Sequence, residues 1–239
     1  MALIRLDRYL SEAGVGSRSE VKKFIAWGRV TVDGKVCRDP SAKINEEATV
    51  TVDGVTEVRT EFRTIAMNKP AGYLSATEDR DLPTVSDLLE GRWAKFDLKP
   101  AGRLDRDTVG LLIMTNNGAL NHGIISPSRN VPKVYEAVLD AELPFDAKDR
   151  FEMGIILDDG YVCLPAELTF YDSENKVAKV KVREGKYHQV KRMFAALGAN
   201  VVALKRLSVG PVCLGDLAPG EFRELTGDEL SALMKCAGL

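Results

Sequence analysis

The chain has few of the residues that build metal sites and disulfide frameworks. Its 239 residues include two histidines and four cysteines, and no Cys-x-x-Cys pair occurs. The cysteines are far apart in the sequence, at Cys37, Cys163, Cys213 and Cys236. Because zinc ribbons and disulfide frameworks require closely spaced or paired cysteines, the sequence argues against both. Two histidines also argue against a histidine-built site, so we expect the protein to bind no metal.

Long hydrophobic runs are missing as well. No apolar stretch approaches the roughly 20 residues that a membrane-spanning helix requires. Residues 1–5 lack the apolar core of a secretory signal peptide. Hydrophobic residues make up 45% of the chain and charged residues 28%, which is ordinary for a globular protein. We therefore expect a cytoplasmic protein that does not associate with a membrane.

The net charge of −2 hides a segregation of charge along the chain. Residues 176–206 contain nine basic residues and one acidic residue, and residues 5–43 contain nine basic and five acidic residues. Residues 140–174 instead contain ten acidic and two basic residues. Clustered cations are typical of surfaces that bind nucleic-acid phosphates. We therefore expect one basic face and an acidic opposite side.

Residues 1–60 are predicted to form a small domain of two helices followed by hairpins. Apolar residues recur at helical spacing over residues 6–13. Ser17 and Glu20 form a capping-box pattern that begins the second helix. The alternating stretch at residues 30–36 is interrupted by Asp-Gly, which is a strong hairpin signal. A second stretch of this kind occupies residues 48–54.

Three cations mark one flank of the second predicted helix. Arg18, Lys22 and Arg29 fall close together in helical projection, away from the apolar side. Either they bind RNA or they simply solvate an exposed helix face. The arrangement resembles the αL RNA-binding domain first described in a ribosomal protein of the small subunit. The matching segments are RLDRYL (residues 5–10), SRSEV (residues 17–21) and GRVTVDG (residues 28–34).

A polar hinge near residues 57–63 is predicted to separate this domain from a larger one over residues 61–239. In the larger domain, β-branched runs alternate with loops and a few helices, which predicts an α+β fold with a mostly antiparallel sheet. The predicted strands are residues 64–67, 110–115, 133–139, 177–183 and 200–204, and residues 188–197 are predicted to be a helix. The Asn-Asn-Gly sequence at residues 116–118 predicts a turn.

The most distinctive stretch is GRLDRDTVGLLIMTNNG, at residues 102–118. It places Asp105 in a glycine-flanked loop directly before an apolar run that is predicted to be a buried strand. A carboxylate at such a position is costly unless it is paired or used chemically. On these residues alone, a catalytic acid and a loop aspartate that binds a backbone amide are equal alternatives. Asp107 is expected to be a surface acid.

Residues 102–118 resemble the core motif of pseudouridine synthases, in which the aspartate at the position of Asp105 is the nucleophile. Three further segments resemble motifs of this family and occur in the family's order: NKPAGY (residues 68–73), KVYEAV (residues 133–138) and EGKYHQVKRM (residues 184–193). The implied reaction breaks the N-glycosidic bond of a uridine in RNA, rotates the base and rejoins it through carbon. It involves no redox change or net hydrolysis, so no cofactor is implied. The target nucleotide must be flipped out of its RNA structure.

The resemblance also implies roles for individual residues. Tyr135 would stack on the target uracil with its hydroxyl placed for proton transfer, whereas by itself it would be interpreted as a core tyrosine. Lys191 would pair with the carboxylate of Asp105, and the spacing leaves Lys186 as an alternative partner. Whether Asp105 attacks a sugar carbon or a base carbon stays open. The implied RNA contacts of this domain are Arg103, Lys69, Lys186 and Arg192.

The combination of these motifs resembles the RsuA branch of the family, which modifies a single uridine in 16S rRNA. The implied partner is ribosomal RNA or a partly assembled small ribosomal subunit, and we expect the enzyme to be a monomer. Three alternatives are a 23S rRNA synthase of the same family, a non-catalytic ribosome-assembly factor and a carboxylate-using hydrolase. The hydrolase would need a second acid about 5–9 Å from Asp105, and no second motif carboxylate suggests one.

Overall fold

The computed structural model describes residues 3–57 and 62–239, which form two compact units. The N-terminal unit comprises Met1–Arg63 and Leu89–Leu98, and the C-terminal unit comprises Thr64–Leu88 and Lys99–Leu239. The predicted domain boundary at residues 60 and 61, and most of the predicted hinge, lie outside the described residues. Within the described ranges, no helix has the length and apolar character needed to cross a membrane.

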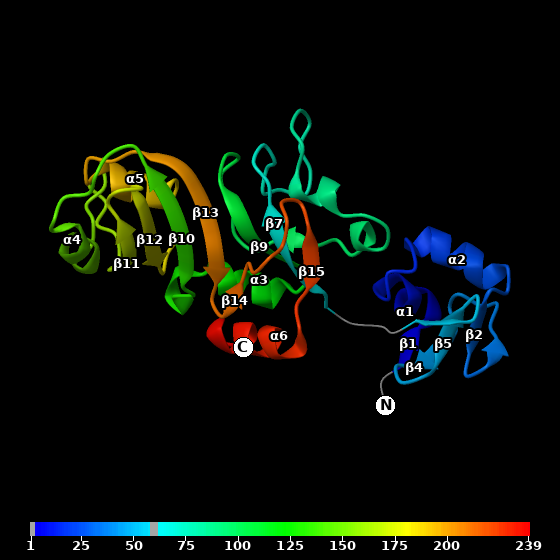
Figure 1. Ribbon diagram of the computed structural model, residues 1–239. Helices are drawn as coiled ribbons and strands as arrows, with labels where there is room; N and C mark the ends of the chain where they lie inside the picture. Colours follow the sequence, from blue (N-terminus) through cyan, green and yellow to red (C-terminus); the bar gives the residue numbers. More distant parts are fainter. Residues whose placement is uncertain (1–2, 58–61) are drawn as a thin grey trace. The chain divides into compact units, whose positions relative to one another are not determined.

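The N-terminal unit has the predicted helices and hairpins (Figure 1). Strands β2, β3, β5 and β6 form a sheet in the order β3-β2-β5-β6, and β1 pairs with β4. Asp33 and Gly34 both have positive φ angles, of 47° and 77°, as the tight turn between β2 and β3 requires. The elements are β1 (Leu3–Arg5), α1 (Leu6–Glu12), α2 (Arg18–Ala26), β2 (Val30–Val32), β3 (Lys35–Val36), β4 (Lys43–Asn45), β5 (Val50–Val52) and β6 (Val55–Glu57).

The capping box predicted at the start of α2 is confirmed. The hydroxyl of Ser17 accepts a hydrogen bond from the Glu20 amide at 3.3 Å, and the Glu20 carboxylate accepts one from the Ser17 amide at 2.8 Å. Both bonds satisfy backbone groups that a helix start leaves unpaired. Buried Val21 and Ile25 then place the apolar side of α2 in the core of this unit.

The segment Leu89–Leu98, which contains the 3₁₀ helix η2 (Trp93–Lys95), packs with the N-terminal unit. Phe96 is 5% exposed, and its ring lies against Gly14. A methyl group added at Gly14 would lie 2.2 Å from Cζ of Phe96. The φ of Gly14, +78°, also favours glycine there, so both the backbone and the packing require a residue without a side chain.

The C-terminal unit is built around a nine-stranded sheet whose main path is β11-β12-β10-β13-β9-β7-β15. Among its described strand pairs, only β9 and β13 are parallel, which confirms the predicted mostly antiparallel α+β fold. The strands are β7 (Thr64–Lys69), β8 (Lys99–Pro100), β9 (Val109–Thr115), β10 (Lys133–Leu139), β11 (Glu167–Asp172), β12 (Val177–Val182), β13 (Val201–Val209), β14 (Val212–Cys213) and β15 (Phe222–Glu224).

Helices cover the two halves of this sheet (Figure 1). Phe151 of α4 and Phe194 of α5 are fully buried with strands β10 and β12. Leu120 of α3 and Leu233 of α6 are fully buried with strands β7 and β9. Each such side chain contributes about 1.5–3 kcal/mol of burial free energy. The helices are η1 (Val85–Leu88), α3 (Gly118–Ile125), η3 (Pro127–Arg129), α4 (Ala147–Met153), α5 (Gln189–Ala195) and α6 (Gly227–Cys236).

Two local predictions differ from the structure. The Asn-Asn-Gly turn predicted at residues 116–118 is the start of helix α3. Its cap is Asn117, whose side chain accepts hydrogen bonds from the amides of Ala119 and Leu120, both at 3.1 Å. The strand predicted at residues 200–204 continues to Val209, because β13 pairs along both β9 and β10.

Some of the charges that are segregated along the sequence pair with one another in the structure. Strand β12 carries basic residues and lies antiparallel to the more acidic strand β11. Lys181 and Arg183 therefore pair with Glu167, at 3.0 and 3.4 Å. Arg192 of α5 binds Asp158 and Asp159 in the same way. Part of the predicted acidic side thus forms ion pairs with residues of the predicted basic face.

The parallel contact of β9 with β13 predicts a strong effect of a single methyl group. A Cβ at Gly110 would lie 2.3 Å from O and 2.7 Å from N of Arg206, and the φ of Gly110 is +101°. Gly110→Ala should lower the free energy of unfolding by about 2–4 kcal/mol, since neither backbone can move aside freely. Gly118→Ala is the matched control, because its Cβ would meet no heavy atom within 4 Å. Equal urea midpoints for the two variants would contradict the prediction.

A second prediction concerns pH. Arg223 binds the carboxylate of Glu229 at 2.6 and 2.7 Å and lowers the pKa of Glu229 to about 2, from an ordinary value of 4.5. Because the pKa is lower in the folded state, the ionised Glu229 stabilises the folded protein above pH 4.5. This contribution to the free energy of unfolding is lost as the pH falls from 4.5 towards 2. Glu229→Gln should therefore destabilise the protein by about 1–2 kcal/mol at pH 7, allowing for partial solvent screening.

The measurement is urea unfolding of wild type and Glu229→Gln across the acidic range. The difference between the two should shrink as the pH falls below 4.5. Asp228→Asn, at the neighbouring exposed acid, should show a much smaller difference at every pH. A Glu229→Gln effect that stays constant between pH 7 and the acidic limit would rule out this ion pair as its cause.

Candidate active site

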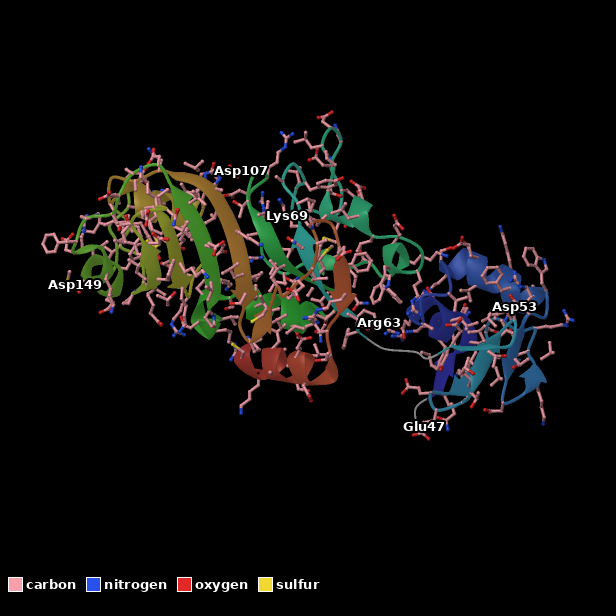
Figure 2. The ribbon with its side chains drawn as sticks, viewed as in Figure 1. Glu47, Asp53, Arg63, Lys69, Asp107 and Asp149 are labelled. Carbon is pink, nitrogen blue, oxygen red and sulfur yellow. The ribbon has the colours of Figure 1, made fainter. Side chains whose placement is uncertain are left out.

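Asp105 lies in the loop between β8 and β9, directly before the buried part of β9. Its side chain is 30% exposed, so the carboxylate is open to a ligand. The pairing of β7 with β9 places Lys69 opposite Gly110, at the end of the sheet where this loop leads into β9. Figure 2 shows the labelled Lys69 and Asp107 near one another at that end. The loop therefore stands on the most buried strands of the unit.

Lys69 holds the loop from inside. Its side chain is fully buried, and its ammonium donates hydrogen bonds to the carbonyl oxygens of Pro70 (3.1 Å), Arg106 (3.3 Å) and Thr108 (2.9 Å). Burial lowers the pKa of Lys69 to about 8. The expected contact between Lys69 and an RNA phosphate does not fit this burial, because the ammonium is enclosed by the residues that flank Asp105.

Ser75 fixes the other side of the loop. Its hydroxyl donates to the carbonyl of Leu104 at 2.9 Å and accepts from the amide of Leu104 at 3.0 Å. Ser75 is 8% exposed, so both hydrogen bonds are shielded from water. The residue that precedes Asp105 is thus held on its amide and its carbonyl, which restricts where the carboxylate can point.

Lys191 is the cation that lies within ion-pair distance of Asp105. Its Nζ is 3.5 Å from Oδ2 of Asp105 and 2.7 and 2.8 Å from the two carboxylate oxygens of Asp107. Asp107 is largely exposed, as expected, but its hydrogen bonds from Lys191 hold its pKa below the usual range. The alternative partner, Lys186, lies instead with its ammonium 4.7 Å from the ring centroid of Tyr161.

His188 is a neighbour of Asp105 that the sequence patterns did not single out. Its Nε2 lies 3.4 Å from Oδ1 of Asp105, on the side opposite the oxygen that faces Lys191. The residue has a φ of +49°, in the left-handed region that non-glycine residues rarely adopt. Its ring stacks on Tyr187 with centroids 3.8 Å apart. The sequence signal was its place in the EGKYHQVKRM segment, to which no role of the histidine was assigned.

Tyr135 is paired with a buried arginine. Strand register places it opposite Arg206, after an irregularity between Val134 and Tyr135 that turns the tyrosine. Arg206 is 3% exposed and donates through Nη1 to the Tyr135 hydroxyl at 3.3 Å and through Nε to the carbonyl of Leu111 at 2.7 Å. Its Nη2 has no hydrogen-bond partner within the described ranges. No motif pointed to Arg206, since its role depends on strand register.

A buried carboxylate organises the loop that carries Lys186 and His188. Glu184 is 5% exposed and accepts hydrogen bonds from the Tyr161 hydroxyl (2.8 Å) and from the Gln189 side chain (2.7 Å). The side-chain oxygen Oε1 of Gln189 in turn accepts a hydrogen bond from the backbone amide of Lys186 at 2.9 Å. These bonds fix both ends of the loop, and the fixed loop holds the backbone of Lys186 and His188 beside Asp105.

Asp105 is at the junction of two hollows. An inner cavity of about 70 Å³ is also lined by Thr108 and Tyr135, and a wider groove of about 780 Å³ is also lined by Tyr187. The residues that line both are Arg103, Leu104, Asp105, Gly185, Lys186 and His188. Two of the predicted RNA contacts, Arg103 and Lys186, are therefore beside the catalytic candidate. Arg192 is not, since its guanidinium is bound to Asp158 and Asp159.

The predicted RNA contacts of the N-terminal unit are only partly brought together. Arg18 and Lys22 line one hollow of about 270 Å³ together with Arg5, Asp7 and Arg8. Arg29 does not line it, and its guanidinium binds the carboxylate of Asp53. Helical projection placed Arg29 with the other two cations, but α2 ends at Ala26, so that projection does not apply to Arg29.

The family model described as RNA pseudouridylate synthase matches residues 63–196, and the S4 domain model matches residues 4–50. The "Uncharacterized RNA pseudouridine synthase YtzG" of Bacillus subtilis (strain 168) is 46% identical over 234 residues, covering 96% of this chain and 98% of that protein. The "Ribosomal small subunit pseudouridine synthase A" of Escherichia coli (strain K12) is 38% identical, covering 97% and 100%.

A solved structure gives the same result. The one described as "Crystal structure of pseudouridylate synthase" has a TM-score of 0.68 and 33% identity, and the match covers 96% of this chain and 99% of that chain. The predicted fold class and the predicted enzyme class, an isomerase, are thereby confirmed. The chain belongs to the RNA pseudouridylate synthase family, in its RsuA-type branch with an N-terminal S4 domain.

Proposed function

We propose that the protein converts one uridine of 16S ribosomal RNA to pseudouridine, with Asp105 as the nucleophile. The observation that carries the proposal is the position of the Asp105 carboxylate. It lies between Lys191 and His188 and lines a cavity of about 70 Å³ that Tyr135 also lines. Ribosomal RNA as the substrate is supported by relatives named as ribosomal small subunit synthases, which are 38% identical over almost their whole length.

The reaction begins when the target uridine leaves its RNA structure and its uracil enters the inner cavity. The Asp105 carboxylate bonds to a carbon of the sugar or of the base, and the bond between the sugar and the ring nitrogen breaks. The uracil then rotates, and a ring carbon forms the new bond to the sugar. That carbon loses its proton, the ring nitrogen gains one, and the carboxylate leaves unchanged.

Lys191 keeps the nucleophile ready for attack. The ammonium 3.5 Å from Oδ2 attracts the Asp105 carboxylate and holds it in position. Asp107, with its shorter bonds to Lys191, fixes the ammonium while Asp105 exchanges protein contacts for substrate contacts. The pair of acids therefore divides two tasks, with Asp105 attacking and Asp107 positioning the cation.

Tyr135 holds the uracil while the bond to the sugar is broken. Stacking of a base on an aromatic ring contributes about 1–3 kcal/mol, which is enough to keep a detached base in place. Because Arg206 donates to the hydroxyl oxygen of Tyr135, the hydroxyl hydrogen is free to point towards the base. Thr108, whose buried Oγ1 has no partner within the described residues, offers a further polar contact in the cavity.

The RNA backbone is bound by cations on both units. Arg103 and Lys186 line the cavity and the groove, and Arg18 and Lys22 line the hollow of the S4 domain. Arg29 and Arg192 must first exchange their aspartate partners for phosphates, so we assign them a smaller part. The isomerisation involves no redox change or net hydrolysis, and we therefore propose that the enzyme uses neither metal nor cofactor. We also propose that the enzyme is monomeric and cytoplasmic.

Mapping of pseudouridine in ribosomal RNA from cells with and without the gene tests the proposal. We expect one 16S position to lose pseudouridine without the gene and to regain it with the wild-type gene. Asp105→Asn should fail to restore it, with a rate at least about 10³-fold lower in vitro, because an amide cannot act as the nucleophile. The affinity of Asp105→Asn for RNA should stay close to that of wild type.

Asp216→Asn, the same chemical change at an exposed loop acid, is the control and should restore the modification. Loss of pseudouridine at a 23S position instead would show that the protein is a 23S rRNA synthase. No lost position in either RNA would favour the non-catalytic assembly factor. Normal activity of Asp105→Asn would refute the catalytic role of this residue.

Lys69 should affect turnover more than RNA binding. Lys69→Met keeps the length of the side chain but removes three hydrogen bonds to the loop around Asp105. We expect kcat to fall about 10- to 100-fold and stability to fall by about 1–3 kcal/mol, with KM nearly unchanged. Lys148→Met, at an exposed lysine of α4, should match wild type. A higher KM that depends on salt, with kcat unchanged, would show instead that Lys69 contacts phosphate.

A further inference from the structure

An exposed aromatic residue stands at the edge of the active site without a packing role. The side chain of Tyr187 is 76% exposed, although a tyrosine ring is a large apolar surface. One face of its ring stacks on the His188 ring, with centroids 3.8 Å apart and 17° between planes. An aromatic surface that is both exposed and held in one orientation is suited to receive another flat group.

The backbone that presents this ring is strained. His188 has a φ of +49° and a ψ of +29°, a conformation that costs a non-glycine residue free energy and persists only where the surroundings impose it. Here the surroundings are the buried Glu184 and the Gln189 side chain that fix the loop. Strain of this kind is concentrated at functional sites. It brings Tyr187 and His188 onto the same wall of the groove.

The groove in front of Tyr187 continues from the cavity that receives the target base. The two share Asp105 and His188 as lining residues, and the groove volume of about 780 Å³ is far larger than the inner cavity of about 70 Å³. Beyond His188 the groove has apolar walls, which include Ile125, 48% exposed at the end of α3. The groove therefore offers a path for an RNA chain whose uracil occupies the inner cavity.

The charges of the groove fit an RNA backbone. Arg103, Arg106 and Lys186 line it, and Asp105 is the single acid among its lining residues. Cations around an apolar floor with an exposed aromatic ring are the pattern of single-stranded nucleic-acid sites, where phosphates meet the cations and bases stack on the ring.

We propose that Tyr187, supported by His188, is the stacking platform for the nucleobase next to the target uridine in the same RNA chain. The occupant is an unpaired nucleotide, and every base can stack on the ring, with purines favoured by their larger surface. This inference rests on the proposed function for the identity of the target. It goes beyond that function by assigning a second base-binding subsite.

The test uses the full-length protein and short oligoribonucleotides of uridine that carry one 2-aminopurine, whose fluorescence falls on stacking. We expect saturable quenching by wild type and by Tyr187→Phe, which keeps the ring. Tyr187→Ala should bind roughly 5- to 150-fold more weakly and quench less, as expected for the loss of one stacked base. Phe145→Ala, at a fully exposed phenylalanine of the same unit, is the matched control and should behave as wild type.

Two results would overturn the platform: absence of quenching by wild type, or equal quenching and affinity for wild type and Tyr187→Ala. Because Tyr187 is exposed, its variants should unfold at the wild-type temperature, which separates loss of stacking from loss of folding. The kinetic counterpart, on ribosomal RNA, is a KM raised by a similar factor in Tyr187→Ala with kcat changed much less.

Failure of this inference and failure of the proposed function give different results. If wild type modifies no ribosomal RNA, the proposed function falls, and the quenching measurement still decides whether the platform exists. If wild type modifies its uridine and Tyr187→Ala matches it in KM and in quenching, the platform falls and the proposed function stands.

Discussion

Gly110 and Arg206 meet backbone to backbone where β9 runs parallel to β13, and only a residue without a side chain can occupy the first of these positions. This pairing joins the two halves of the nine-stranded sheet. One half supplies Lys69 and the loop of Asp105, and the other supplies Tyr135. The distance between Asp105 and Tyr135 therefore depends on a backbone contact that neither residue makes.

The site also depends on how buried charge is shared. Lys69 is fully buried and donates three hydrogen bonds to backbone carbonyls. Arg206 is almost fully buried and donates one hydrogen bond to the carbonyl of Leu111 and one to the hydroxyl of Tyr135, so both cations stabilise the shape of the site. Lys191 is partly exposed and divides its charge between Asp105 and Asp107. The cations that shape the pocket are thus separate from the cation that faces Asp105.

Much of the fold could be predicted from sequence because its signals are local. The capping box at Ser17, the Asp-Gly turns and the alternating strands each depend on residues a few positions apart. The loop of Asp105 was found by its motif. Lys69 and Arg206 could not be interpreted correctly, since their partners lie 39 and 71 positions away and are brought near by strand register. The ion pairs between the basic and acidic stretches could not be predicted for the same reason, because they depend on the pairing of β11 with β12.

The segment Leu89–Leu98 has a consequence for how the chain is made. Proteins are synthesised from the N-terminus, and domains generally fold as they emerge. The first 63 residues hold both helices and all strands described in the N-terminal unit, but Phe96, which covers Gly14, is encoded later. A nascent chain that ends before residue 96 therefore exposes the apolar surface around Gly14. The N-terminal unit completes its packing only when part of the chain beyond β7 has already been synthesised.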